Sequence, residues 1–424
     1  MRPFHVATIA LISLLAVPLG TTACQAREKP PGEEGGANAD LAAVASDALA
    51  KASALRGIAL PAGHTVKSSV ASKADVGRYL GDRLRATDSA RLIDDTGRML
   101  RVFGAVKPDF DMMSAFEKAA TEQIAGYYDW EKRTLFVADW LPTFVQAPIM
   151  VHEATHALQD ARFHLARFMT PKAGLEDVQA AVQALIEGDA TLVMAEGMFP
   201  EGSSPASRQL AFGMMEQQLE AQIANLDIDP VIAESMIFPY ARGLRFARLL
   251  KDKGGYAAVD AAYKELPRST EQILHPEKYK GGGAEDPPQR VDFEVPKALA
   301  AQGFTLAMPS VLGELGVTTI LRRSMAPEAA ATAAAGWDGD LALLLGAPGK
   351  ADAVVLVSVW DSEEDAAEAK AGFATTKNPP RALVQDGAKL AGIWGADVGD
   401  PEGVAKAALG AARFGEVVAD FPEK

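Results

Sequence analysis

The sequence predicts an α+β protein, in which a mainly helical region with one β-hairpin is followed by a small C-terminal α+β domain. Apolar residues recur at steps of three and four through most of the first 280 positions, as in amphipathic helices. The period changes in "AGYYDWEKRTLFVADW" (125–140), where two strand-like runs flank a charged turn at 129–133. After "GGGAEDPP" (281–288) the composition shifts and strand-like runs appear. A chain of 424 residues, 48% hydrophobic and 23% charged, is long enough for two or three folded domains.

The first 23 residues have the layout of a secretory signal peptide. Arg2 precedes the apolar run "VATIALISLLAVPLG" (6–20), which is too short to span a membrane, and "TTAC" then leads to Cys24. Cys24 is the single cysteine, and a cysteine at the cleavage point resembles a bacterial lipoprotein signal, whose thiol receives lipid. Thr21 stands where that signal usually carries Leu, so secretion without lipid is the alternative.

Residues 24–40 are rich in Pro, Gly and Glu, which predicts a flexible tether. We therefore expect an exported bacterial protein of the cell envelope, whose contact with a membrane is the lipid on Cys24. The formal net charge of −14, without a block of Lys and Arg, argues against a nucleic-acid partner.

Residues 41–120 are expected to form an N-terminal helical and mixed region, which is either part of the main domain or a pro-segment that masks it. Its predicted elements are a helix from Asp40 to about Gly57, a strand at 64–72 and helices at 73–84 and 88–106.

Residues 121–280 are expected to form the main domain, which begins with the hairpin. A helix should start at Pro148, whose missing N–H has no partner in a first turn anyway, and continue to about Met169. Further helices are predicted at 175–199, 208–226 and 229–255. Residues 289–424 should form the C-terminal domain, with strands at 340–346 and 353–360 and helices at 362–373 and 401–414.

The stretch "VHEATHALQD" (151–160) contains the pattern H-E-x-x-H. In a helix, His152 and His156 lie one turn apart on one face and can direct their imidazoles at a single Zn²⁺. Glu153 then lies beside the metal, where it can take a proton from a metal-activated water and pass it to a leaving amine. The alternative is a helix with two surface histidines. The flanking apolar residues favour burial, and buried histidines need partners such as a metal.

A third ligand has to come from elsewhere, because Gln159 and Arg162 replace the Gly and His of the extended zinc motif. Glu187 in "LIEGDA" follows the apolar run 184–186, where a buried carboxylate is costly unless it meets a cation. Glu196 is the alternative ligand, although its setting is less apolar and close to a helix end.

"VHEATHALQD" followed by "LIEGDA" resembles the gluzincin branch of zinc metallopeptidases, and also a group of uncharacterised bacterial exported proteins with the same HExxH-ALQD form. The resemblance extends from about Glu122 to Tyr279. It implies a zincin-like domain in which His152, His156 and Glu187 bind Zn²⁺ and Glu153 is the general base. It also implies that an edge strand of the hairpin lies along the cleft, where an extended peptide substrate adds to it.

One position departs from the thermolysin-like pattern, in which an Asp follows the glutamate ligand by four residues. Thr191 stands there, so we expect Asp160, four residues after His156, to accept the other N–H of a ligating imidazole. Tyr240 and His275 are candidate donors to the developing oxyanion, with a buried core tyrosine and a turn-capping histidine as the alternatives.

The predicted function is zinc-dependent hydrolysis of peptide bonds. Two alternatives stay open from the sequence. One is a non-catalytic exported binding protein with a structural zinc, which would need a fourth protein ligand such as His164 or His275. The other is a zinc hydrolase that acts on a non-peptide amide or ester.

Overall fold

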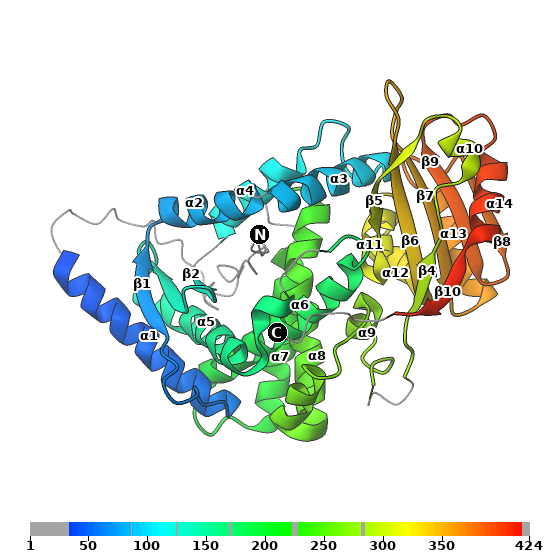
Figure 1. Ribbon diagram of the computed structural model, residues 1–424. Helices are drawn as coiled ribbons and strands as arrows, with labels where there is room; N and C mark the ends of the chain where they lie inside the picture. Colours follow the sequence, from blue (N-terminus) through cyan, green and yellow to red (C-terminus); the bar gives the residue numbers. More distant parts are fainter. Residues whose placement is uncertain are drawn as a thin grey trace.

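The computed structural model describes residues 34–85, 87–123, 126–168, 172–222, 228–280 and 285–417. A helical part with a small sheet lies beside a part built on a larger sheet (Figure 1). The mixed α+β class expected from the sequence is therefore confirmed. Within these residues, no helix combines the length and the apolar composition that crossing a membrane requires.

The helical part comprises the segments up to residue 280. Its helices are α1 (Glu34–Arg56), α2 (Lys73–Leu84), α3 (Thr87–Phe103), α4 (Met112–Gln123), α5 (Thr143–Phe163), the short 3-10 helix η2 (Leu165–Phe168), α6 (Glu176–Met198), α7 (Pro205–Gln222), α8 (Pro230–Ala262) and α9 (Thr270–Leu274). Its strands are β1 (Lys67–Ala71), β2 (Gly126–Asp129) and β3 (Thr134–Ala138).

The predicted hairpin is present, because β2 and β3 pair antiparallel with Tyr128 opposite Leu135. Strand β1 pairs parallel with β3, so the order is β1-β3-β2 and β2 is an edge strand. Helix α1 buries Ala45 and Ala52 in one core with residues of α5, α6 and α8. The beginning of the region 41–120 therefore shares a core with residues 121–280.

Helices α6 and α8 cross in close contact at two glycines. A Cβ built on Gly188 would lie 2.1 Å from the carbonyl carbon and oxygen of Gly243, and a Cβ on Gly243 would lie 2.1 Å from the carbonyl oxygen of Ala184. Only residues without a side chain allow this approach. The crossing explains why a helical segment contains Gly188, and it places the neighbouring Glu187 in the core.

Two helices have boundaries that differ from the sequence predictions. The flexible tether was expected to extend to residue 40, but α1 begins at Glu34, so the last seven positions of the expected tether are helical. The signal peptide and residues 24–33, which include Cys24, lie outside the described residues. Helix α5 begins at Thr143 after Pro142, so Pro148 lies inside the helix instead of opening it. The helix ends at His164, whose φ of 58° is left-handed, and not near Met169.

The C-terminal part contains a five-stranded antiparallel sheet of order β5-β6-β7-β9-β8. Its elements are β4 (Gln289–Asp292), α10 (Lys297–Ala300), β5 (Thr305–Ser310), α11 (Gly313–Leu321), α12 (Pro327–Ala334), β6 (Trp337–Gly346), β7 (Ala353–Trp360), α13 (Glu363–Ala374), β8 (Ala382–Asp386), β9 (Lys389–Gly395), α14 (Pro401–Ala411) and β10 (Arg413–Glu416). The strands β6 and β7 and the helices α13 and α14 are those that the sequence predicts.

Both faces of this sheet are covered, which explains the continuous apolar run of β6. Leu343 and Leu345 face a core shared with α10 and α14, whereas Leu344 faces a core shared with α3, α11 and α13. Helix α3 belongs to this second core through Phe103, whose ring lies 5.1 Å from that of Trp394. The region 41–120 is therefore divided between the two parts and joins them along one side of the molecule (Figure 1).

Candidate metal centre

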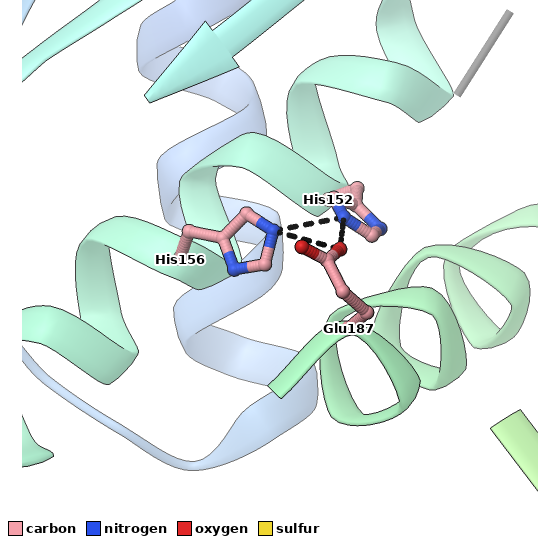
Figure 2. Close-up of side chains that lie close together, drawn as sticks. All are labelled: His152, His156 and Glu187. Atoms are coloured by element: carbon pink, nitrogen blue, oxygen red, sulfur yellow. Dashed lines mark hydrogen bonds and ion pairs between the residues drawn. The ribbon is translucent and has the colours of Figure 1, made fainter. Parts of the chain in front are cut away.

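His152, His156 and Glu187 converge from α5 and α6 to form what we term the His/Glu cluster (Figure 2). Nε2 of His152 lies 3.1 Å from Oε2 of Glu187, and Nε2 of His156 lies 3.3 Å from the same oxygen. The two Nε2 atoms are 2.9 Å apart. The geometric expectation that a carboxylate of the following helix meets both imidazoles is thus met.

The donor set of this cluster fits a divalent cation. Donor atoms on a tetrahedral zinc with bonds of about 2.0–2.1 Å lie about 3.3 Å from one another, close to the separations observed. Hydrogen bonds alone satisfy the three atoms poorly. If Nε2 of one histidine donates a hydrogen bond to Nε2 of the other, the accepting nitrogen carries a lone pair and no proton. That lone pair then lies close to the negatively charged oxygen of Glu187, which it repels. Because His152 and Glu187 are 0% exposed, water cannot relieve that repulsion.

The charge states within the cluster also suit metal binding. Burial lowers the pKa of His152 to about 4, so this imidazole is neutral and keeps a free lone pair. For Glu187, burial alone would raise the pKa, but the charge of His156 and the contacts with both rings lower it to about 2. Burial would likewise lower the pKa of His156, yet the charge of Glu187 outweighs it and raises the value to about 9. A metal that binds here therefore displaces a proton from His156.

Glu153 lies next to His152 and has no structural partner. It is 1% exposed, and neither carboxylate oxygen has a hydrogen-bond partner within the described part of the chain. Burial raises its pKa to about 8, and the backbone N–H of Tyr128 on β2 lowers it slightly without reaching hydrogen-bond geometry. Edge strand β2 thus lies beside this carboxyl. A buried acid that serves no scaffold contact is a candidate for chemistry.

The hydrogen-bond partner of His156 is Gln159, the residue that stands where the extended motif has Gly. Its Oε1 lies 2.8 Å from Nδ1 of His156, and its Nε2 donates to Asp189 at 3.0 Å. Asp189 in turn accepts from Nε of Arg56 at 2.7 Å and from the hydroxyl of Tyr263 at 3.1 Å. The sequence feature that indicates this contact is an amide side chain three residues after the second histidine, on the same face of the helix.

The expectation for Asp160 is wrong. Its carboxylate accepts from the hydroxyl of Tyr128 at 3.1 Å and from the backbone N–H of Leu165 at 3.1 Å, and so anchors β2 and the end of α5. Positions three and four after His156 both lie near its face of the helix. Packing of α6 against α5 decides in favour of Gln159, which also donates to the carbonyl of Ile186 at 3.1 Å.

The two candidate oxyanion donors lie in different places. Tyr240 is buried, and its ring centroid lies 6.1 Å from that of His152. His275 contacts Glu314 at 3.0 Å and lines a separate cavity of about 440 Å³. The structure therefore gives His275 an ion-pair role in place of the expected contact with the reacting group.

Other candidate ligands stay away from the His/Glu cluster. Glu196 pairs with Lys251 and accepts from Tyr256 at 2.9 Å. Among the residues that the structure describes, neither His164 nor His275 joins the three donors. A second acidic group, Glu271 with Asp286 and Asp361, contacts the ammonium of Lys278, whose Nζ lies 2.6 Å from Glu271 and 3.0 Å from Asp286.

Comparison with known families gives one match. A family model described as a domain of unknown function (DUF8575) matches residues 305–405, which extend from β5 into α14 and do not include the His/Glu cluster. No curated protein and no solved structure matches the chain.

Proposed function

We propose that the chain is a zinc-dependent peptidase with a zincin-like helical part. The observation that supports this most strongly is the buried meeting of two imidazoles and one carboxylate beside a second, unpartnered carboxyl. Three protein ligands are the number that catalytic zinc sites use, since the fourth position stays open for water or substrate. All four residues of edge strand β2, next to Glu153, are buried, so an extended peptide that adds to the main-chain groups of β2 must displace what covers them.

In this proposal each residue has one task. A zinc ion in the cluster would act as a Lewis acid that polarises the peptide carbonyl and activates a water. Glu153 takes a proton from the attacking water and delivers it to the leaving amine; burial raises the pKa of this carboxyl to about 8, which favours the protonated form that donates to the amine. Gln159 accepts from Nδ1–H of His156, which keeps Nε2 of that ring free as a ligand. Tyr240, packed against His152, is the candidate donor to the oxyanion.

The test of the base is Glu153→Gln, with Glu201→Gln as the matched control. Glu201 is an exposed carboxylate outside the cluster, so the control makes the same chemical change elsewhere. We expect Glu153→Gln to retain zinc, measured by atomic emission, and to lose on the order of 10²- to 10⁴-fold in turnover of a mixed peptide library. Turnover equal to that of the control would remove Glu153 as the base.

The test of the ligand set is Glu187→Ala, which should lose bound zinc while the other variants keep it. Unchanged zinc content would show that the third ligand is another residue.

The same assays of zinc content and turnover separate the peptidase from the two alternative functions. Zinc in stoichiometric amount without turnover of peptides, esters or amides indicates a structural metal, whereas turnover of non-peptide amides or esters alone indicates a hydrolase of another substrate class.

We also propose that the protein is exported and anchored by a lipid on Cys24. The support is the sequence of the first 24 residues. Cys24→Ser should move the protein from the membrane fraction to the soluble fraction and abolish labelling with a radioactive fatty acid. Unlabelled wild-type protein in the soluble fraction would favour a secreted form without lipid.

A further inference from the structure

A cavity of about 550 Å³ lies where the end of α3 meets the C-terminal sheet. Five basic residues line it, and Asp352 is the one acidic residue of its wall. We term it the basic cavity; its basic residues are Arg98, Arg101, Lys107, Arg323 and Lys377. They come from α3, the loop after it, the end of α11 and the loop after α13, so the cavity is assembled from segments distant in the sequence.

The acidic residue is already neutralised. Nε and Nη2 of Arg98 donate to the two oxygens of Asp352 at 2.9 Å and 2.7 Å, and Nη1 of Arg98 donates to Asp95 at 2.6 Å. This guanidinium is therefore fully engaged with carboxylates. Because both oxygens of Asp352 already accept from Arg98, this carboxylate does not balance the charges of the other cations.

None of the remaining four cations forms a direct ion pair with a carboxylate among the described residues, although the charge of Arg101 acts on Asp111 and that of Arg323 acts on Glu234. Arg101 donates to the backbone carbonyl of Phe110 at 2.7 Å, which carries no charge. Arg323 is half-buried, and its Nε is buried without a hydrogen-bond partner. Its neighbour Arg322 takes the ion pair with Glu234, at 3.3 Å. Lys107 and Lys377 are exposed at the rim.

Arg101 and Arg323 are partly buried, which weakens the screening of their mutual repulsion by water, and the exposed Lys107 and Lys377 add positive charge at the rim. The protein carries 56 acidic against 42 basic residues, so carboxylates are in excess over the whole chain. Asp352 is nevertheless the one carboxylate that lines this cavity. A bound anion removes the repulsion, and Arg and Lys together are the side chains that hold phosphate oxygens.

Most of the rest of the wall is apolar and small, with Val102, Ala105, Val106 and Pro108 on the side of α3, and Asn378 is its one uncharged polar side chain. A cavity of this volume accommodates a small organic molecule more readily than an isolated ion. We propose that the basic cavity binds a phosphate-bearing organic anion, with the phosphate held by Arg101 and Arg323 and the organic part against the apolar wall. This site shares no residue with the His/Glu cluster, so the proposal stands apart from the peptidase function.

Binding there should also fasten the two parts of the molecule to each other. Arg101 and Lys107 belong to the segment of α3, whereas Arg323 and Lys377 belong to the stretch that the family model covers. An anion bridging them adds to the packing of Phe103 on Trp394. A ligand that binds only the folded assembly raises the unfolding temperature.

The experiment measures binding of glycerol 3-phosphate and inorganic pyrophosphate to the full chain by calorimetry, together with the unfolding temperature. A second arm measures co-sedimentation with phosphatidylcholine vesicles that contain phosphatidic acid, because a lipid headgroup presents the same phosphate chemistry. The test variant is Arg323→Gln with Lys377→Gln. The matched control is Lys264→Gln with Lys297→Gln, two exposed lysines outside the cavity that remove the same charge.

We expect binding of at least one probe, a rise in unfolding temperature with it, and a loss of about tenfold or more in affinity for the cavity variant. The control should stay within about twofold of wild type. Binding of the soluble probes indicates a free phosphate ester, and binding of vesicles alone indicates a lipid headgroup. The proposal is overturned if no probe binds the wild type, or if the control loses as much affinity as the cavity variant.

Discussion

Gly188→Ala tests the close crossing of α6 and α8 that places Glu187. The added Cβ would lie 2.1 Å from the carbonyl group of Gly243, whereas ordinary contact begins at 3.4 Å, so the helices must separate by about 1.3 Å. The atoms that collide belong to the backbone and cannot rotate away. Overpacking of this kind costs about 1–3 kcal/mol or more, and the better helix propensity of Ala returns about 1 kcal/mol.

We therefore expect Gly188→Ala to lower the free energy of unfolding by about 2 kcal/mol. It should also weaken zinc binding, because a shift of α6 displaces the Glu187 oxygen from its position 3.1 Å from Nε2 of His152. Denaturant unfolding and a zinc titration measure the two effects.

The matched control is Gly213→Ala in α7, where an added Cβ meets no atom within 4 Å. This variant should be neutral or more stable by up to about 1 kcal/mol, since it gains helix propensity without a collision. Gly188→Ala as stable as wild type, with zinc affinity unchanged, would refute the close approach of the two helices.

Three further predictions concern Gln159 beside the His/Glu cluster, the buried pair of Arg56 with Asp189, and the buried carboxyl of Asp177. Gln159→Leu should weaken zinc binding about 10- to 100-fold, because His156 Nδ1 loses its partner at 2.8 Å; chelator competition measures this, and unchanged affinity would contradict it. Arg56→Met should cost about 3 kcal/mol in denaturant unfolding, since the carboxylate of Asp189 stays buried without its cation; a loss below about 1 kcal/mol would speak against that pairing. Asp177→Asn should flatten the pH dependence of stability. Burial raises the pKa of Asp177 from 3.8 to about 7, so its contribution is present below about pH 4 and is lost as the pH rises toward 7; parallel curves of unfolding temperature for variant and wild type would refute this.

Much of the secondary structure was predictable because it depends on neighbouring residues. The periodicity of α2, α6, α13 and α14, and the alternation in the hairpin, indicate these elements directly. Strands β5, β8 and β9 were not predicted, because each is short and only pairing makes its backbone extended: β5 pairs with β6, β9 with β7, and β8 with β9. The predicted start of the helix at Pro148 was wrong, because the helix already begins after Pro142, where the chain leaves the hairpin.

The placement of His152 and His156 on one helix face, with Glu153 beside them, follows from helix geometry and was predictable from ten consecutive residues. Glu187 followed from the cost of an unpaired carboxylate in an apolar run, and the structure brings it to the pair. Gln159 in place of Asp160, and the basic cavity with Arg98 bound to a carboxylate 254 positions away, follow from how whole elements pack against each other. Such contacts depend on distances between segments that no local pattern of residues encodes, since a helix shows its own face but not the neighbour that will cover it.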